Sequence, residues 1–316
     1  SKTKAILFVA AYGNAGKLDE IERYAKRNNL FLINDCAPAL FGSFKNKPIA
    51  AYGDFSVLSF FADKTITTGE GGMLLSDNSE LINEANIYKH DGRKERGVDT
   101  IERRGYNFRI TELQSAVGVA QLKKADYFVK RKKEILKIYT AKLSRVAEVK
   151  VFQFNPQGDF VPHRIIIFVP EAASLIKYLN SCGVGVRTLF MPMHSQPAYI
   201  STLISGACSQ DKSRNAPSEE HCDESKGNRS VSAQARQVAA ELLDNLKKEF
   251  PTTQKVFSQG VCLPSAPALS GQDIEFICGH IRTFYGAPRA SPWYPFGGIR
   301  RSIPLDSPRS LGVIRS

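Results

Sequence analysis

The segment from Ser59 to Met73 places a lysine and three glycines between two apolar runs, and it constrains the fold more than any other stretch. The runs at 55–58 and 73–75 each predict a buried strand, so Lys64 is expected beside a sheet. Burial disfavours a charged ammonium group, which leaves a neutral amine able to form a Schiff base with a carbonyl compound. A surface hairpin with a solvated lysine is the alternative, and spacing alone favours that alternative.

Two familiar phosphate-binding motifs do not fit this segment. A Walker loop has its glycines before the Lys-Ser/Thr pair, whereas Gly69, Gly71 and Gly72 follow Lys64. The glycines also lack the spacing of a dinucleotide-binding loop. They would instead let the backbone approach a ligand closely or adopt positive φ angles. Ser59 lies five residues before the lysine. Its hydroxyl could bind an anionic group of the carbonyl compound that reacts with Lys64.

The beginning of the chain predicts a βαβ unit that ends in a carboxylate. Residues 5–12 form a continuous apolar run typical of a parallel strand, 17–28 have helical periodicity, and 30–34 form a second run. Asp35 follows at the carboxyl end of that strand, where open α/β sheets bind their ligands. A turn residue or a helix cap is the commoner role for an Asp in this position.

The motif Ser-Phe-Phe-x-x-Lys-Thr-Ile-Thr-Thr-Gly-Glu-Gly-Gly-Met resembles the lysine segment of the DegT/DnrJ/EryC1/StrS sugar aminotransferases, most closely the perosamine synthase type. The resemblance implies an α/β fold, the fold type I of enzymes dependent on pyridoxal phosphate (PLP). It also implies a large, mainly parallel-sheet domain, N-terminally incomplete, and a small C-terminal α+β domain. Lys64 is then the Schiff-base lysine, Ser59 a phosphate ligand, and Asp35 the partner of the pyridine nitrogen. The implied reaction moves an amino group from glutamate to a nucleotide-linked 4-keto-6-deoxy sugar.

The segment Gly105-Tyr-Asn-Phe-Arg109 resembles a second family motif, whose Asn reaches the cofactor phosphate of the neighbouring subunit. Asn107 therefore implies a homodimer with composite active sites, although an Asn before a helix is otherwise ordinary turn chemistry. The stretch 187–199 is similar to the segment before the family's substrate site. It makes Arg187 and His194 candidate substrate contacts, with a structural His in a Pro-rich loop as the alternative.

Two departures from the family pattern favour a rival interpretation, a catalytically impaired fragment or a non-catalytic remnant of this family. Pro38 stands where the family has Gln or Glu near the cofactor ring, and proline has no side-chain hydrogen bond to give. The family's N-terminal segment, whose loop at a helix N-terminus holds the cofactor phosphate, is expected to be missing. A dehydratase with His in place of the lysine is a further rival, against which Lys64 argues.

The domain organisation follows from composition and helix signals. We expect a PLP-binding part over 1–148, a small domain over 149–286 with a flexible insertion at 201–231, and a disordered tail at 287–316. Asp77 with Glu80 and Thr111 with Gln114 predict two capped helices. A third helix over 126–143 is expected to link the domains.

Composition and charge exclude several other classes. The formal charge is +12, but no nucleic-acid module accompanies it, and the run Lys130–Lys133 is interpreted as a solvated helix face. The chain has no unbroken apolar run of ~20 residues and no signal peptide, so we expect a protein of the cytoplasm without membrane contact. The six cysteines form no CxxC pair, which predicts neither a zinc site nor a disulfide framework.

Overall fold

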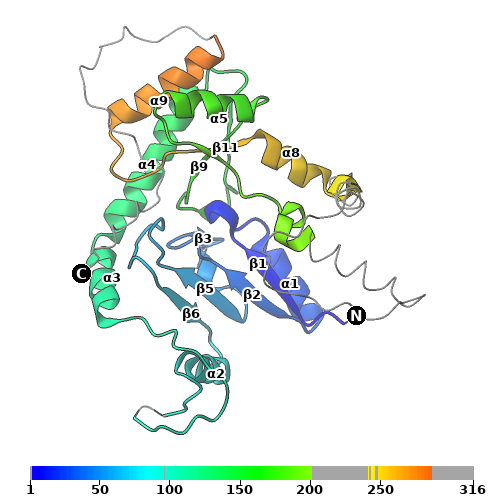
Figure 1. Cartoon of the computed structure of the whole chain (residues 1–316), viewed down its shortest axis with the longest axis vertical. Helices are drawn as coiled ribbons and strands as arrows, with labels where there is room; N and C mark the ends of the chain where they lie inside the picture. The colour runs from blue at the N-terminus through cyan, green and yellow to red at the C-terminus, as the bar shows by residue number, and fades with distance from the viewer. Residues whose placement is uncertain (1, 96, 201–240, 242, 246–247, 287–316) are drawn as a thin grey trace, which may run out of the picture.

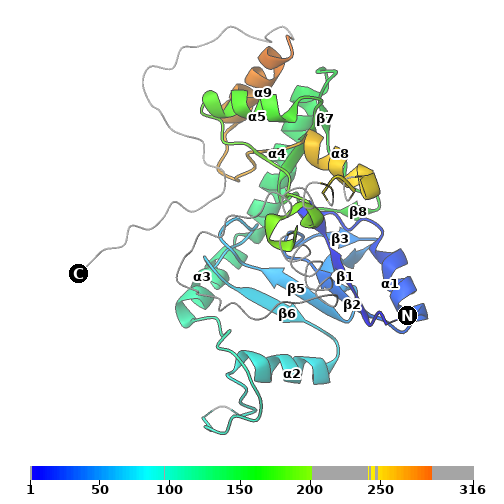
Figure 2. The same cartoon turned by 45° about the vertical axis from the view of Figure 1, so that its right-hand side comes forward.

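The computed structural model describes residues 2–95, 97–200, 241, 243–245 and 248–286. The described chain folds into two larger sheets with helices packed on them, and a small third sheet (Figure 1). The first sheet comes from the N-terminal third, and the second sheet, from the later part of the chain, lies beyond its carboxyl edge (Figure 2). Among these residues, no helix is long and apolar enough to cross a membrane. The expected insertion at 201–231 and tail at 287–316 lie outside the described residues.

The first sheet has the order β1-β2-β5-β6, from β1 (Ala5–Val9), β2 (Phe31–Asp35), β5 (Phe55–Ser59) and β6 (Gly72–Leu75). The first three strands are parallel, and α1 (Leu18–Arg27) makes the crossover from β1 to β2. The predicted βαβ unit is confirmed. The first strand ends three residues early because Ala11–Gly13 turn as a short 3-10 helix (η1) at the carboxyl edge.

One face of this sheet is packed and the other is open. Helix α1 covers the packed face, where Leu18 and Ala25 join Leu32 and Phe44 in a buried cluster. Strand residues alternate between the two faces, so the set Leu7, Val9, Phe31 and Leu74 lies on the opposite face, and these side chains are 46–64% exposed. The sheet therefore presents an open apolar face that ends, at its carboxyl edge, beside Asp35.

The strand after the lysine segment differs from the prediction. β6 pairs antiparallel with β5 at the sheet edge, and Gly72, Met73 and Leu74 are exposed. The prediction of a second buried strand was wrong because an apolar run indicates a strand without indicating which of its faces finds a partner.

Three helices carry the chain from the first sheet to the second. α2 (Ser79–Lys89) is capped by Asn78, whose side chain accepts from Glu80 and Leu81 backbone amides, and not by Asp77 as predicted. α3 (Glu112–Leu122) begins with the predicted capping box of Thr111 and Gln114. α4 (Ala125–Leu143) follows and packs along α9 (Figure 1).

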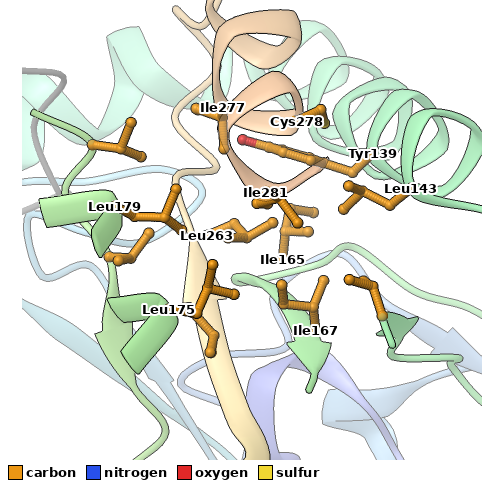
Figure 3. Close-up of a cluster of buried hydrophobic side chains, with 14 of the residues drawn as sticks. Tyr139, Leu143, Ile165, Ile167, Leu175, Leu179, Leu263, Ile277, Cys278 and Ile281 are labelled. Carbon is orange, nitrogen blue, oxygen red and sulfur yellow. The ribbon is translucent and has the colours of Figure 1, made fainter. Parts of the chain in front are cut away.

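The second sheet is antiparallel, with the order β10-β11-β9-β7. Its strands are β7 (Lys150–Val151), β9 (Ile165–Phe168), β10 (Arg187–Thr188) and β11 (Gly260–Leu263). The helices around it are α5 (Ala172–Ser181), α8 (Pro251–Gln259) and α9 (Gly271–Phe284). Tyr139 and Leu143 of α4 enter its core together with Leu175, Leu263 and Ile277 (Figure 3). The linking helix thus belongs to the second core over its C-terminal half.

A small third sheet ties the two parts together. It joins β4 (Lys47–Pro48), β3 (Ser43–Phe44) and β8 (Gly158–Asp159) in that order. Gly13, after β1, reinforces the connection because its φ is +97° and a Cβ there would lie 2.5 Å from the Val161 carbonyl oxygen. Two short 3-10 helices, η2 (Ile49–Ala51) and η3 (Met193–Ser195), complete the described elements.

Candidate functional site

Asp35 and Ser59 lie at the carboxyl ends of neighbouring parallel strands. Asp35 pairs with Val57, and Ser59 follows two residues later in β5. Because side chains two residues apart share a face, the carboxylate and the hydroxyl both lie on the face that α1 does not cover. Asp35 Oδ1 accepts from the Ala37 amide at 2.9 Å, and Ser59 Oγ accepts from the Phe61 amide at 3.2 Å. These local bonds fix both side chains at the edge of the sheet.

The turn that carries Lys64 folds back on the end of β5. The Lys64 amide donates to Phe61 O at 3.0 Å, and the Thr68 amide donates to Phe60 O at 2.9 Å. Gly71 closes the turn at φ +152°, and a Cβ there would lie 2.6 Å from Thr68 Oγ1. Gln114 of α3 donates to Glu70 O at 3.0 Å, so the same helix that the capping box starts also holds the turn.

The side chain of Lys64 is largely enclosed, with 16% of its surface exposed. It lines a pocket of about 150 Å³ between the lysine turn and helix α4. Lys132 of α4, which is 2% exposed, lines the same pocket, as do Phe128 and Pro267. A primary amine beside a second buried lysine in a small pocket has the surroundings expected of a reactive group.

Asp63 connects the lysine turn to the second sheet. Its Oδ1 lies 3.7 Å from Lys64 Nζ, and its Oδ2 accepts from the Arg164 guanidinium at 2.5 Å. His163 Nε2 lies 3.9 Å from the same Oδ2. Asp63 is 14% exposed, and His163 and Arg164 are each 3% exposed, so the cluster is shielded from solvent.

The imidazole of His163 is neutral in spite of its nearness to Asp63. Burial, and after it the charges of Lys64 and Arg164, lower the pKa of His163 from 6.5 to about 2. The distance of 3.9 Å therefore describes a neutral ring beside a carboxylate and not an ion pair, because burial disfavours the charged imidazole and the nearby cations add to that effect.

The neutral His163 predicts a pH-dependent stability. Below about pH 6.5 the unfolded chain protonates this imidazole and the folded chain does not, so the free energy of unfolding falls by up to ~1.4 kcal/mol per pH unit. Stability is retained above pH 6.5 and lost progressively toward pH 2. Urea unfolding between pH 7.5 and 5 measures the slope. His163→Gln is expected to have a shallower slope, and equal slopes in both chains would contradict the assignment.

Asn107 lies apart from this cluster. It is exposed in the loop between α2 and α3, where it forms an isolated antiparallel bridge with His90. Tyr106 and Phe108 beside it stack on each other with centroids 5.0 Å apart, and both rings are exposed. Within the part of the chain that the structure describes, neither a hydrogen bond nor an ion pair joins Asn107 to Lys64.

The two candidate substrate contacts lie in different surroundings. Arg187 in β10 is half-buried, and its charge contributes to the lowered pKa of His163. Arg187 therefore lies near the lysine cluster. His194 packs against Phe250 with ring centroids 4.9 Å apart, and its Nε2 lies 3.0 Å from Gln254 Nε2. The geometry joins Arg187 to the site and gives His194 a packing role against α8.

The sequence analysis missed three members of the cluster, Asp63, His163 and Arg164. The position of Asp63 next to Lys64 was a signal for the first, while the other two come from the segment just before β9, about a hundred residues away. Lys132 was assigned to a solvated helix face, and this prediction was wrong. It faces the pocket because the helix carrying it packs between the lysine turn and α9.

The fold and the site together define a class of protein. A mainly parallel sheet with a helix on one face, followed by an antiparallel sheet with helices around it, is the arrangement of fold type I enzymes that use PLP. A putative sugar aminotransferase from Streptococcus pneumoniae, in its PLP form, has the same fold at a TM-score of 0.71 and 20% identity. Helicobacter pylori PseC matches at a TM-score of 0.70 and 20% identity. Each alignment covers 90% of this chain. The first covers 69% of the Streptococcus pneumoniae structure, and the second covers 67% of PseC.

The model of the DegT/DnrJ/EryC1/StrS aminotransferase family matches residues 1–220, and the chain belongs to that family. The family is PLP-dependent. A GDP-perosamine synthase of Escherichia coli O157:H7 is 30% identical over 292 residues, which are 90% of this chain and 66% of that protein. A UDP-4-amino-4,6-dideoxy-N-acetyl-beta-L-altrosamine transaminase of Campylobacter jejuni is 31% identical over 62% of this chain and 54% of the relative. The chain thus spans about two thirds or less of the length of these curated relatives.

Proposed function

We propose that this chain carries the lysine-bearing part of a PLP-dependent aminotransferase that acts on a nucleotide-linked 4-keto-6-deoxy sugar. The observation that carries the proposal is the shared edge of β2 and β5, where Asp35 and Ser59 lie on one face just before the turn that bears Lys64. The three groups have the chemistry that PLP requires: a primary amine, a carboxylate and a hydroxyl.

PLP supplies a carbonyl carbon and an electron-withdrawing pyridine ring when it is bound. In the proposed site, Lys64 would hold the cofactor through its amine and would move the proton of the reacting carbon. The Asp35 carboxylate would favour a protonated ring nitrogen, and the Ser59 hydroxyl would bind the phosphate. Pro38, in the position where the family has Gln or Glu, contributes no side-chain hydrogen bond to the ring.

The sugar substrate is proposed from the relatives, two of which are a GDP-perosamine synthase and a UDP-sugar transaminase. The higher coverage of the GDP-perosamine synthase favours a GDP-linked sugar aminated at carbon 4, with glutamate as amino donor. The product would enter a surface polysaccharide, and the reaction belongs in the cytoplasm, where nucleotide sugars are made.

A homodimer completes the proposed site. Asn107 lies on an exposed loop away from Lys64, as expected of a residue that serves a neighbouring subunit. Helix α3 supports this assembly because Leu113, Val117, Val119 and Leu122 are 48–82% exposed along it.

Absorbance spectroscopy tests the proposal. The purified chain is titrated with PLP, glutamate is added, and the visible band of the protein-bound cofactor is followed. A band that bleaches with glutamate and returns with a GDP-linked 4-keto sugar supports the proposal, and return with a UDP-linked sugar alone would change the assigned nucleotide. A chain that forms no band is a non-catalytic member of the family, which is the rival that Pro38 favours.

A further inference from the structure

A carboxylate and a guanidinium that the proposed chemistry does not use lie beside the lysine. Asp63 Oδ1 is 3.7 Å from Lys64 Nζ, and Asp63 Oδ2 is 2.5 Å from the Arg164 guanidinium. The two groups come from distant parts of the chain, Asp63 from the lysine turn and Arg164 from the segment that leads into β9. Arg164 is 3% exposed, and a charge so enclosed is costly unless it is paired. The contact is therefore a specific feature of the site.

The charges around this contact are unevenly balanced. His163 is neutral, so it adds nothing to the sum. The cations whose charges help to lower the pKa of His163 are Lys64, Arg164, Lys132 and Arg187. Asp63 is the carboxylate within ion-pair distance of Lys64, Arg164 and His163. The position of the Asp63 carboxylate between Lys64 and Arg164 makes the lysine amine sensitive to it.

We propose that Asp63 and Arg164 are positioning residues for Lys64: Asp63 holds the amine in place and favours its protonated form, and Arg164 limits that attraction. A carboxylate near an amine stabilises the ammonium form, and a guanidinium bound to the same carboxylate weakens this effect. Because Arg164 directly precedes β9 of the second sheet, the pair also links the lysine turn to that sheet.

This inference rests on the proposed function for the importance of Lys64, but its test does not require PLP. Amines react with acylating reagents only as the neutral form, so the labelling rate of Lys64 reports how firmly its proton is held. The chain without added cofactor is labelled briefly at pH 8 with acetic anhydride, and the Lys64 peptide is quantified by mass spectrometry. Lys17, whose side chain is 76% exposed, serves as the internal standard.

Two single substitutions are expected to act in opposite directions. Asp63→Asn removes the attraction, so Lys64 is labelled faster by about three- to tenfold. Arg164→Gln leaves the carboxylate less neutralised, so Lys64 is labelled more slowly by a similar factor. Asp19→Asn is the matched control, because it removes the carboxylate 2.7 Å from Lys45 and leaves the Lys64 rate unchanged.

Opposite signs separate this role from a merely structural one. If the pair only held the turn closed, both substitutions would expose Lys64 and both would accelerate labelling, which overturns the proposal. Unchanged rates also overturn it. If Arg164→Gln alone fails to fold, Asp63→Asn is compared with Asp63→Asn/Arg164→Gln. Equal rates in these two variants, both faster than in the unchanged chain, support the proposal, because Arg164 acts through a carboxylate that both variants lack, and a different rate in the double variant overturns it. A chain that binds no PLP but gives the opposite signs would refute only the proposed function.

Discussion

Lys64→Arg is expected to abolish the visible band formed with PLP and to reduce amino transfer by about 10³-fold, because the group that carries and moves the reacting proton is lost. Asp63 Oδ1 lies 3.7 Å from Lys64 Nζ. Arginine at position 64 places a positive charge beside this carboxylate, so Asp63 keeps a cationic neighbour. Its guanidinium stays protonated, however, and cannot attach to a carbonyl carbon. The fold is therefore expected to survive a change that removes the chemistry.

Absorbance with PLP and the rate of amino transfer from glutamate measure this effect, and circular dichroism confirms folding. Lys45→Arg is the matched control because Lys45 is a partly exposed lysine of the same domain, paired with Asp19. It is expected to leave the band and the rate unchanged. A Lys64→Arg chain that still forms the band would show that another amine, such as that of Lys132, binds the cofactor.

Tyr139→Ala is expected to lower the free energy of unfolding by about 4 kcal/mol, a large share of the stability of an ordinary domain. Tyr139 is fully buried in the core that joins α4 to the second sheet (Figure 3), and its hydroxyl donates to Pro264 O at 3.1 Å. The substitution leaves a ring-sized cavity and an unpaired carbonyl. Since α4 also carries Lys132, the pocket around Lys64 is expected to loosen with it.

Tyr139→Phe separates the two contributions to this loss. It keeps the ring and removes only the hydrogen bond, so the expected loss is about 1–2 kcal/mol. Tyr24→Ala on α1 is the control, because Tyr24 is 59% exposed and its loss changes stability by about 0.5 kcal/mol or less. Urea unfolding followed by circular dichroism measures all three chains. Equal stability of Tyr139→Ala and Tyr24→Ala would contradict the assigned core.

The local sequence determined the elements that meet at the candidate site. Apolar runs of strand length predicted β1, β2 and β5, and turn residues placed Asp35 and Lys64 after two of them, because strand polarity and hydrophobic periodicity are local properties. The capping box of Thr111 and Gln114 was predicted for the same reason. The motif around Lys64 indicated the family, which the comparisons then confirmed.

Only the tertiary structure decided what surrounds the lysine. Arg164 and His163 meet Asp63 from the segment just before β9, about a hundred residues away, and no local pattern encodes that contact. Lys132 belongs to a charged run that is typical of a solvated helix face, yet it is buried because α4 packs across the lysine turn. The partners of a buried charge depend on which surfaces the folded chain brings together, since burial is a property of packing and not of residue type.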